Sequence, residues 1–191
     1  MRVIAGKYRS RRLRSLPGLN LRPTADRLRE TLFNVLTAGN PTALQGTVWF
    51  DLYAGTGAVG IEAVSRGAGM VHFVESSGRA AELIKQNLAS LGIGIGFQIL
   101  KQDSIRALRA LEPGGAVADF VFLDPPYEME EACRQTLETL SQSRLLKREG
   151  IVIAEHQKKF DPGEAFGPLR RYRKLVQGDA ALSFYRLAPA Q

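Results

Sequence analysis

The tetrapeptide Asp124-Pro125-Pro126-Tyr127 combines residue types that could act together on a planar amino group. The Asp124 carboxyl and the Pro125 carbonyl are hydrogen-bond acceptors, and the two prolines stiffen the backbone that carries them. Two acceptors can bind both protons of an exocyclic amino group on a nucleic-acid base, which localises the nitrogen lone pair and directs it outward. Tyr127 offers a flat ring for stacking the base. Alone, the tetrapeptide could also be a rigid turn.

The segment from Asp51 to Gly60 has the spacing of a cofactor-binding turn. Gly55, Gly57 and Gly60 satisfy the G-x-G-x-x-G pattern, in which glycines allow a tight turn and a close approach of backbone to ligand. The pattern alone leaves NAD, FAD and S-adenosylmethionine open. Asp51 favours the last, because a carboxylate there can bind the ammonium of a methionine moiety and would repel a pyrophosphate. The Asp124 tetrapeptide, moreover, has no task in hydride transfer.

Two acidic residues after the next predicted strands could contact a nucleoside. Glu75 can accept hydrogen bonds from both ribose hydroxyls, a task that it could perform for NAD as well. Asp103 can accept from an adenine amino group, but it or Ser104 could equally be a helix N-cap. The predicted cofactor-binding residues are Asp51, Tyr53, Gly55, Gly57, Glu75, Asp103 and Ser104.

Short apolar runs alternating with helix-length amphipathic segments position these residues. The pattern predicts strands at Val48–Asp51, Met70–Glu75, Phe97–Leu100, Phe120–Asp124 and Ile151–Glu155. Helices are expected at about 57–67, 77–91, 104–111 and 129–147. Such alternation indicates a mostly parallel sheet, in which ligands bind at the carboxyl ends of the strands, near the change in strand order. The glycine loop and Asp124 should therefore face one cleft.

The end of the chain departs from this alternation. Arg170–Val176 and Leu182–Leu187, separated by Gln-Gly-Asp, predict an antiparallel hairpin. A plain dinucleotide-binding domain does not require that ending. We therefore expect an α/β, Rossmann-like fold of the class I S-adenosylmethionine-dependent methyltransferases, with a seven-stranded, mostly parallel sheet that ends in an antiparallel hairpin.

The excess positive charge is concentrated at the N-terminus. Residues 1–30 hold nine of the 26 Lys and Arg residues and two of the 19 Asp and Glu residues, so the remainder is balanced. Weak strand patterns at 2–5 and 11–14 predict a small hairpin, and Pro23 starts a helix. We divide the chain into a basic, polyanion-binding extension, 1–40, and a catalytic domain, 41–191. A solvated tail or a site for an acidic protein would also explain the charge.

Composition narrows the remaining classes. The single cysteine, Cys133, allows no internal disulfide and is compatible with a reducing cytoplasm. We see no signal peptide and no run of about 18 apolar residues, so we expect a cytoplasmic protein with no membrane association. His72 and His156 lack metal-ligand spacing with Cys133, so no metal is expected.

Several segments are together similar to the RsmD family of bacterial 16S ribosomal RNA guanine-N2 methyltransferases. They are Met1–Gly6, Leu21–Asn34, Asp51–Ala68, Phe73–Glu75, Asn87–Leu88 and Asp124–Tyr127. The Arg-Pro-Thr sequence that begins at Arg22 is the specific part. Asp-Pro-Pro-Tyr also suits adenine-N6 DNA methyltransferases, and the glycine loop suits the whole superfamily. The residues after Glu155 match only loosely.

The resemblance implies transfer of a methyl group from S-adenosylmethionine to the exocyclic N2 of a guanine, with Asp124 to Tyr127 around the target base. It implies that the substrate is 16S ribosomal RNA in an assembled or partly assembled 30S subunit, and we expect a monomeric enzyme. The predicted RNA-binding residues are Lys7, Arg9, Arg11, Arg12, Arg22, Arg27 and Arg29.

Four alternatives stay open at this point. The nearest is an adenine-N6 DNA methyltransferase, although 191 residues leave little room for the target-recognition insert that such enzymes use. A protein methyltransferase acting on an amide nitrogen has a similar Pro-Pro loop, usually with Asn in place of Asp124. A flavin or NAD oxidoreductase explains only the glycines, and a non-catalytic nucleic-acid-binding module explains only residues 1–30.

Overall fold

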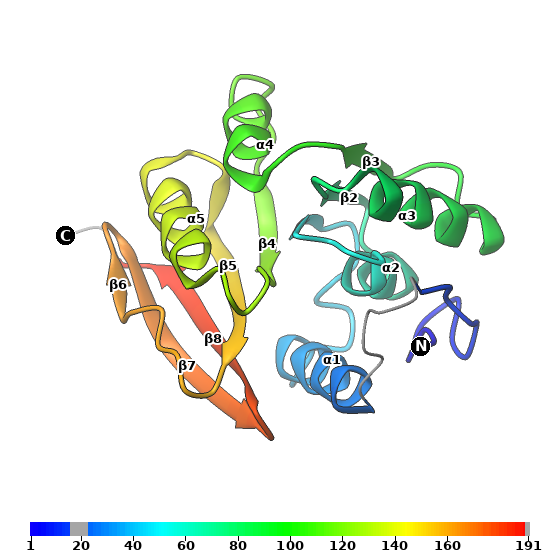
Figure 1. Cartoon of the computed structure of the whole chain (residues 1–191), viewed down its shortest axis with the longest axis horizontal. Coiled ribbons are helices and arrows are strands. Elements are labelled where there is room, and N and C mark those ends of the chain that lie inside the picture. The colour runs from blue at the N-terminus through cyan, green and yellow to red at the C-terminus, as the bar shows by residue number, and fades with distance from the viewer. Residues whose placement is uncertain (16–22, 190–191) are drawn as a thin grey trace.

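An eight-stranded mixed sheet runs through the centre of the fold (Figure 1). The computed structural model describes residues 1–15 and 23–189. The strand order is β3-β2-β1-β4-β5-β8-β7-β6, and the first five of these are parallel to one another. The strands are β1 Val48–Leu52, β2 Met70–Val74, β3 Phe97–Leu100, β4 Ala118–Leu123, β5 Leu146–Gln157, β6 Ala165–Phe166, β7 Leu169–Gln177 and β8 Ala180–Leu187. The helices are α1 Pro23–Leu36, α2 Ala58–Ser65, α3 Gly78–Ser90, α4 Ser104–Leu111 and α5 Glu130–Gln142.

The expected parallel α/β sheet with a C-terminal antiparallel hairpin is confirmed, with a correction to the number of strands. The sequence predicts seven strands and the structure has eight, because the two-residue strand β6 pairs with the start of β7. Two residues are too short to show a period-two pattern. Helix α5 is also shorter than predicted, since the Leu145 carbonyl already accepts from the Ala118 N–H and the chain enters β5 at Leu146.

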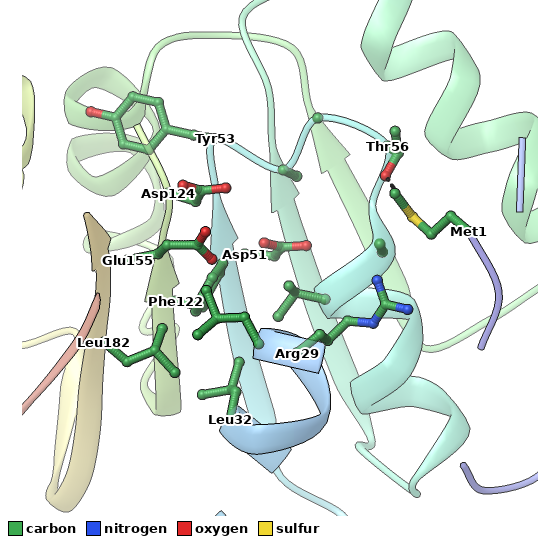
Figure 2. Close-up of a pocket in the computed structure, with 15 residues that line it drawn as sticks. Met1, Arg29, Leu32, Asp51, Tyr53, Thr56, Phe122, Asp124, Glu155 and Leu182 are labelled. Carbon is green, nitrogen blue, oxygen red and sulfur yellow. Dashed lines mark hydrogen bonds between the residues drawn. The ribbon is translucent and has the colours of Figure 1, made fainter. Parts of the chain in front are cut away.

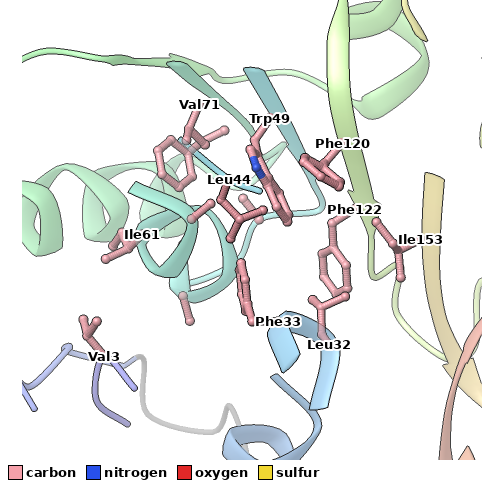
Figure 3. Close-up of a cluster of buried hydrophobic side chains, with 14 of the residues drawn as sticks. Val3, Leu32, Phe33, Leu44, Trp49, Ile61, Val71, Phe120, Phe122 and Ile153 are labelled. Carbon is pink, nitrogen blue, oxygen red and sulfur yellow. The ribbon is translucent and has the colours of Figure 1, made fainter. Parts of the chain in front are cut away.

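Helices cover both faces of the sheet, so successive residues of β1 are buried in opposite directions. The Trp49 ring stacks between Phe33 of α1 and Phe120 of β4, with centroid distances of 5.4 and 4.9 Å (Figure 3). Phe50 belongs to the second core, on the face that α4 and α5 cover. Trp49 and Phe50 are both fully buried. Burial on both faces explains why these strands are continuously apolar.

The strand order reverses beside β1, and this position fixes where a ligand can bind. The chain builds β1, β2 and β3 in one direction and then returns to place β4 on the other side of β1. Leu52 and Leu123 are paired at the carboxyl ends of these two strands. The loops that follow them therefore leave the sheet side by side, which is the position at which open α/β sheets bind ligands.

The first residues of the chain are fastened to helix α2 by a buried carboxylate. Glu62 is fully buried, and its two oxygens accept from the N–H groups of Ile4 at 2.7 Å and Ala5 at 2.9 Å. The Arg66 side chain donates to the same carboxylate at 2.8 Å. Because these three donors all bind one buried carboxylate, Glu62 fixes the position of the N-terminal segment on α2.

The predicted N-terminal hairpin is present as a short one, with an antiparallel bridge between Arg2 and Arg12. The Val3 N–H donates to the Arg11 carbonyl and the Ser10 N–H to the Val3 carbonyl, both at 2.9 Å. The next part of the segment is held by helix α3, where Asn87 Oδ1 accepts from the Arg14 N–H at 2.8 Å. Val3 and Leu13 are buried in the same core as Trp49. Contacts with α2 and α3, together with the cross-strand hydrogen bonds, therefore order these residues.

Replacing Glu62 by Ala should release the N-terminal segment. The change removes the acceptor of two backbone N–H groups and leaves the Arg66 guanidinium, 13% exposed, without its carboxylate. We expect a loss of about 3 kcal/mol in the free energy of unfolding, and fast amide exchange at residues 4 and 5. Glu82→Ala on the exposed surface of α3 is the matched control. Slow exchange of these amides in Glu62→Ala would contradict this role.

Candidate active site

Three carboxyl groups converge at the carboxyl edge of three neighbouring strands. Asp51 lies in β1, Asp124 follows β4, and Glu155 lies in β5. Figure 2 shows the three side chains turned toward one shared space, beside Tyr53. The pairing of β4 with β5 brings Asp124 and Glu155 next to each other, since Leu123 is aligned with Ala154.

Burial disfavours the ionised form of all three carboxyl groups and so raises their pKa values. Burial raises the pKa of Asp51 to about 8, against the Gly60 hydrogen bond, which lowers it, while Asp124 and Glu75 add repulsion. Burial raises the pKa of Asp124 to about 7. Burial, followed by repulsion from Asp124, raises the pKa of Glu155 well above its usual value. A cation placed among these groups would favour their charged forms.

The glycine loop connects β1 to α2 with a backbone that few side chains could adopt. Tyr53, Gly55 and Gly57 have positive φ values of 61°, 55° and 77°. Tyr53 is the non-glycine member, and its hydroxyl shares a hydrogen bond of 2.9 Å with the Thr136 hydroxyl of α5. A strained residue at this position is typical of functional sites.

The last glycine of the pattern is required by packing. A Cβ atom on Gly60 would lie 2.3 Å from the Phe73 ring and 2.9 Å from Asp51 Oδ2. The Gly60 N–H donates to that same oxygen at 2.9 Å. The glycine thus brings α2 close enough to β1 for its first turn to hold the Asp51 carboxyl in place.

Two cavities meet at this loop. The larger has a volume of about 610 Å³ and the smaller about 220 Å³. Tyr53, Gly55, Asp124 and Glu155 line both. The smaller cavity is bounded by Met1, Leu28, Arg29, Leu32, Asp51, Tyr53, Ala54, Gly55, Thr56, Ala58, Val59, Phe122, Asp124, Glu155 and Leu182. A ligand that crosses Gly55 could therefore occupy both.

The remaining predicted cofactor residues line the larger cavity. Glu75 Oε2 accepts from the Gly55 N–H at 2.8 Å, so this carboxylate supports the loop as well as facing the cavity. Asp103 accepts from the Arg106 N–H at 3.0 Å and is the N-cap of α4. Ser104 is buried as the first residue of that helix. The N-cap interpretation of Asp103 is confirmed, while its side chain still borders the cavity.

The Asp124–Tyr127 tetrapeptide lines the larger cavity together with Glu75. Pro125 is buried, Pro126 is exposed and Tyr127 is half-buried. The Pro126 carbonyl accepts from the Met129 N–H at 2.8 Å, which closes a turn before α5. The tetrapeptide and the glycine loop thus lie on two sides of one cavity, and the expectation that they share a cleft is confirmed.

The predicted RNA-binding residues are not equivalent. Five are exposed: Lys7, Arg9, Arg11, Arg12 and Arg27. Arg29 is only 5% exposed and lines the smaller cavity, where its guanidinium donates to the Arg2 carbonyl at 2.6 Å and to Asp26 at 3.1 Å. Arg29 is therefore not part of an exposed basic surface, since it faces inward on α1. Arg22 lies outside the described residues.

Sequence reasoning missed Glu155 as a site residue. The apolar run Ile151–Ala154 predicts a strand, and Glu155 ends the predicted range. Its importance comes from the pairing of β5 with β4, which places it beside Asp124. The available signal was an acidic residue directly after a buried parallel strand, the same signal that marks Asp124.

The site has the features that S-adenosylmethionine requires. The ligand carries an ammonium and a sulfonium, and the cavities offer carboxyl groups for positive charge beside an elongated space. Among residues 1–15 and 23–189, no group of three or more His, Cys, Asp or Glu residues is arranged to hold a metal ion. In the same part of the chain, no helix is long and apolar enough to cross a membrane.

The sheet order, the glycine loop and the Asp124 tetrapeptide define an S-adenosylmethionine-dependent methyltransferase. The sequence model of the family described as conserved hypothetical protein 95 matches residues 1–186. Bacillus subtilis YlbH is 33% identical over 97% of this chain and 98% of its own length. Ribosomal RNA small subunit methyltransferase D of Haemophilus influenzae is 35% identical over 83% of this chain and 79% of its own. The chain belongs to the RsmD family.

A solved structure with the same fold supports the assignment of the chain to this family. The Escherichia coli protein yhhF superposes with a TM-score of 0.81, at 26% identity, and each chain is covered to 98%. The similarity therefore includes the C-terminal hairpin, for which sequence similarity to the family was weak.

The free protein should lose stability as pH rises. The pKa of Asp51 is raised to about 8 in the folded protein, against about 3.9 in an unfolded chain. Between these values the folded state holds more protons, so the free energy of unfolding falls as pH rises from about 4 to about 8. Asp51→Asn should make the fall shallower, by up to about 1.4 kcal/mol per pH unit. Urea unfolding at pH 5, 6, 7 and 8 measures the slope.

Asp179→Asn, at the exposed turn between β7 and β8, is the control for this experiment and should keep the wild-type slope. An Asp51→Asn protein with the wild-type slope would show that Asp51 is already ionised at neutral pH.

Proposed function

We propose that this enzyme transfers the methyl group of S-adenosylmethionine to the exocyclic N2 of a guanine in 16S ribosomal RNA. The observation that carries the proposal is the position of Asp124. Its carboxyl lines both cavities, in a rigid Asp-Pro-Pro-Tyr turn that shares them with Gly55 of the glycine loop. When bound, S-adenosylmethionine supplies an electrophilic methyl group on a positively charged sulfur.

Asp124 and the Pro125 carbonyl accept hydrogen bonds from the two N–H groups of the guanine amino group. Those hydrogen bonds turn the nitrogen lone pair out of conjugation with the ring and toward the methyl group. As the N–CH3 bond replaces the S–CH3 bond, one of these two protons leaves to Asp124 or to water. Tyr127 stacks on the base, a contact worth about 1–3 kcal/mol in single-strand recognition. The target base must be unpaired or flipped out of its helix, because a paired base cannot enter the cavity.

The other acidic residues hold the cofactor in this proposal. Asp51 binds the ammonium of the methionine moiety in the smaller cavity, and Glu75 binds the ribose hydroxyls in the larger. Asp103 and Ser104 lie at the adenine end. Because a cation stabilises nearby carboxylates, cofactor binding lowers the pKa of Asp124 and prepares it as a hydrogen-bond acceptor.

Several observations support ribosomal RNA as the substrate. Relatives from Haemophilus influenzae and Escherichia coli are named ribosomal RNA small subunit methyltransferase D, and the second is 30% identical over 97% of this chain. The exposed side chains of Lys7, Arg9, Arg11, Arg12 and Arg27 suit a polyanion. The proposed substrate is an assembled or partly assembled small subunit in the cytoplasm, with the enzyme acting as a monomer.

The test is tritium transfer from labelled S-adenosylmethionine, offered unmethylated 30S subunits, naked 16S RNA and duplex DNA in parallel. We expect N2-methylguanosine from the 30S subunits after nucleoside analysis. Label in DNA as N6-methyladenine would replace the proposal by the DNA alternative, which the names of the relatives do not favour.

Two variants should separate the roles of the acidic residues. Asp124→Ala should reduce turnover by about 10³-fold or more and change the cofactor Kd by less than about threefold, because Asp124 acts on the base. Glu75→Ala should raise the cofactor Kd by about tenfold or more, since it loses hydrogen bonds to the ribose. Single-turnover transfer and calorimetric cofactor titration measure the two effects. Equal loss of cofactor affinity in both variants would contradict this division.

A further inference from the structure

The β7–β8 hairpin carries a second group of basic side chains, sorted by the two faces of the sheet. On the face toward α5, Arg171 and Lys174 are bound by Asp161 at 2.6 and 2.9 Å, and Glu164 adds a contact of 3.3 Å to Arg171. The positive charge on that face is therefore neutralised by the loop between β5 and β6.

The other face of the hairpin carries arginines without such partners. Arg170 is aligned with Arg186, and Arg173 with Phe184. Phe184 is buried in the core that α1 helps to form, so these three arginines lie on the α1 side of the sheet. All three are exposed, and among the described residues none of them forms an ion pair with a carboxylate.

One of these arginines is held by an aromatic ring. The Arg186 guanidinium lies over the Tyr172 ring, 4.4 Å from its centroid, and Tyr172 in turn packs against Phe184 with a centroid distance of 6.2 Å. Tyr172 is 44% exposed and stands at an irregularity in the β7–β8 pairing. Stacking orients the guanidinium before any ligand arrives, which lowers the entropy lost when its edge binds an anion.

We propose that the face defined by Arg170, Tyr172, Arg173 and Arg186 is a docking surface for the phosphate backbone of the RNA substrate. Three arginines without carboxylate partners attract a polyanion, and an ordered guanidinium can donate two parallel hydrogen bonds to one phosphate. The inference rests on the proposed function, since it names where RNA beyond the target nucleotide lies.

Figure 1 shows helix α1 between the N-terminal segment and the hairpin. Thr31 of α1 also contacts Gln177 of β7, with an oxygen–oxygen distance of 2.8 Å. Leu182 of β8 lines the smaller cavity, and Arg186 follows it by four residues, about 13 Å along the strand. RNA bound here would therefore extend along β8 toward the smaller cavity, on the side of the sheet that carries α1.

The experiment compares binding of unmethylated 30S subunits and naked 16S RNA by wild type and by Arg173→Gln/Arg186→Gln at several salt concentrations. We expect the double variant to bind about tenfold more weakly at 0.1 M salt. The slope of log Kd against log salt should fall by about 1.4–1.8, because two phosphate contacts are lost. The KM for RNA should rise with kcat unchanged, and the Kd for S-adenosylmethionine should stay at the wild-type value.

Arg109→Gln/Arg144→Gln is the matched control, because it removes two exposed charges from the α4 side of the molecule. It should change RNA affinity by less than twofold.

Arg173→Glu is a second test, for the case that the double variant loses stability, because it leaves the Arg186–Tyr172 contact intact. The docking surface would be overturned by a hairpin variant that keeps the wild-type RNA affinity and salt slope. It would also be overturned by a control variant that loses as much RNA affinity as the hairpin variant. In both cases methylation by the wild-type enzyme would still support the proposed function. Wild-type enzyme that neither binds nor methylates the RNA would overturn the proposed function as well.

Discussion

Burial of three carboxyl groups in one low-dielectric cavity is the constraint on which the site depends, and repulsion among them adds to it. Asp51, Asp124 and Glu155 lie in or directly after adjacent strands, so the sheet itself brings them together. Such a cluster is costly when ionised and stable when protonated or beside a cation. A methyl donor carries its charge on the sulfur and loses it when the methyl group leaves. The same cluster should therefore hold the donor more tightly than the neutral thioether product.

The N-terminal segment and helix α1 form part of the lining of the smaller cavity. Glu62 fastens the first residues of the chain to α2, and Met1 and Arg29 complete the wall of the smaller cavity. Arg29 is itself anchored by the Arg2 carbonyl. The N-terminal segment thus has a structural task beside the electrostatic one that its exposed arginines suggest.

Residues whose roles follow from local sequence could be predicted, while those whose roles depend on strand pairing could not. The glycine pattern and Asp124 follow apolar runs directly, so their places at the carboxyl edge are predictable from the alternation. Glu155 shares that signal, but its pairing with Asp124 depends on strand order. Arg29 has the same sequence character as Arg27, and only the rotation of α1 against the sheet buries one and exposes the other. In β7, Arg171 has a carboxylate partner, while Arg170 and Arg173 have none among the described residues. The conformation of the loop that carries Asp161 decides this difference, and the hydrophobic pattern of the sequence does not predict that conformation.

The last strand along the chain is an interior strand of the sheet, since β8 lies between β5 and β7. While the polypeptide is being synthesised, β5 therefore has an open hydrogen-bonding edge until Ala180–Leu187 has left the ribosome. Ile151, Ile153 and the partners of Phe184 stay partly uncovered over the same interval. Folding of the sheet is thus completed only after Ala180–Leu187 has been synthesised, and a chain cut before Ala180 would expose an aggregation-prone edge rather than lose a dispensable tail.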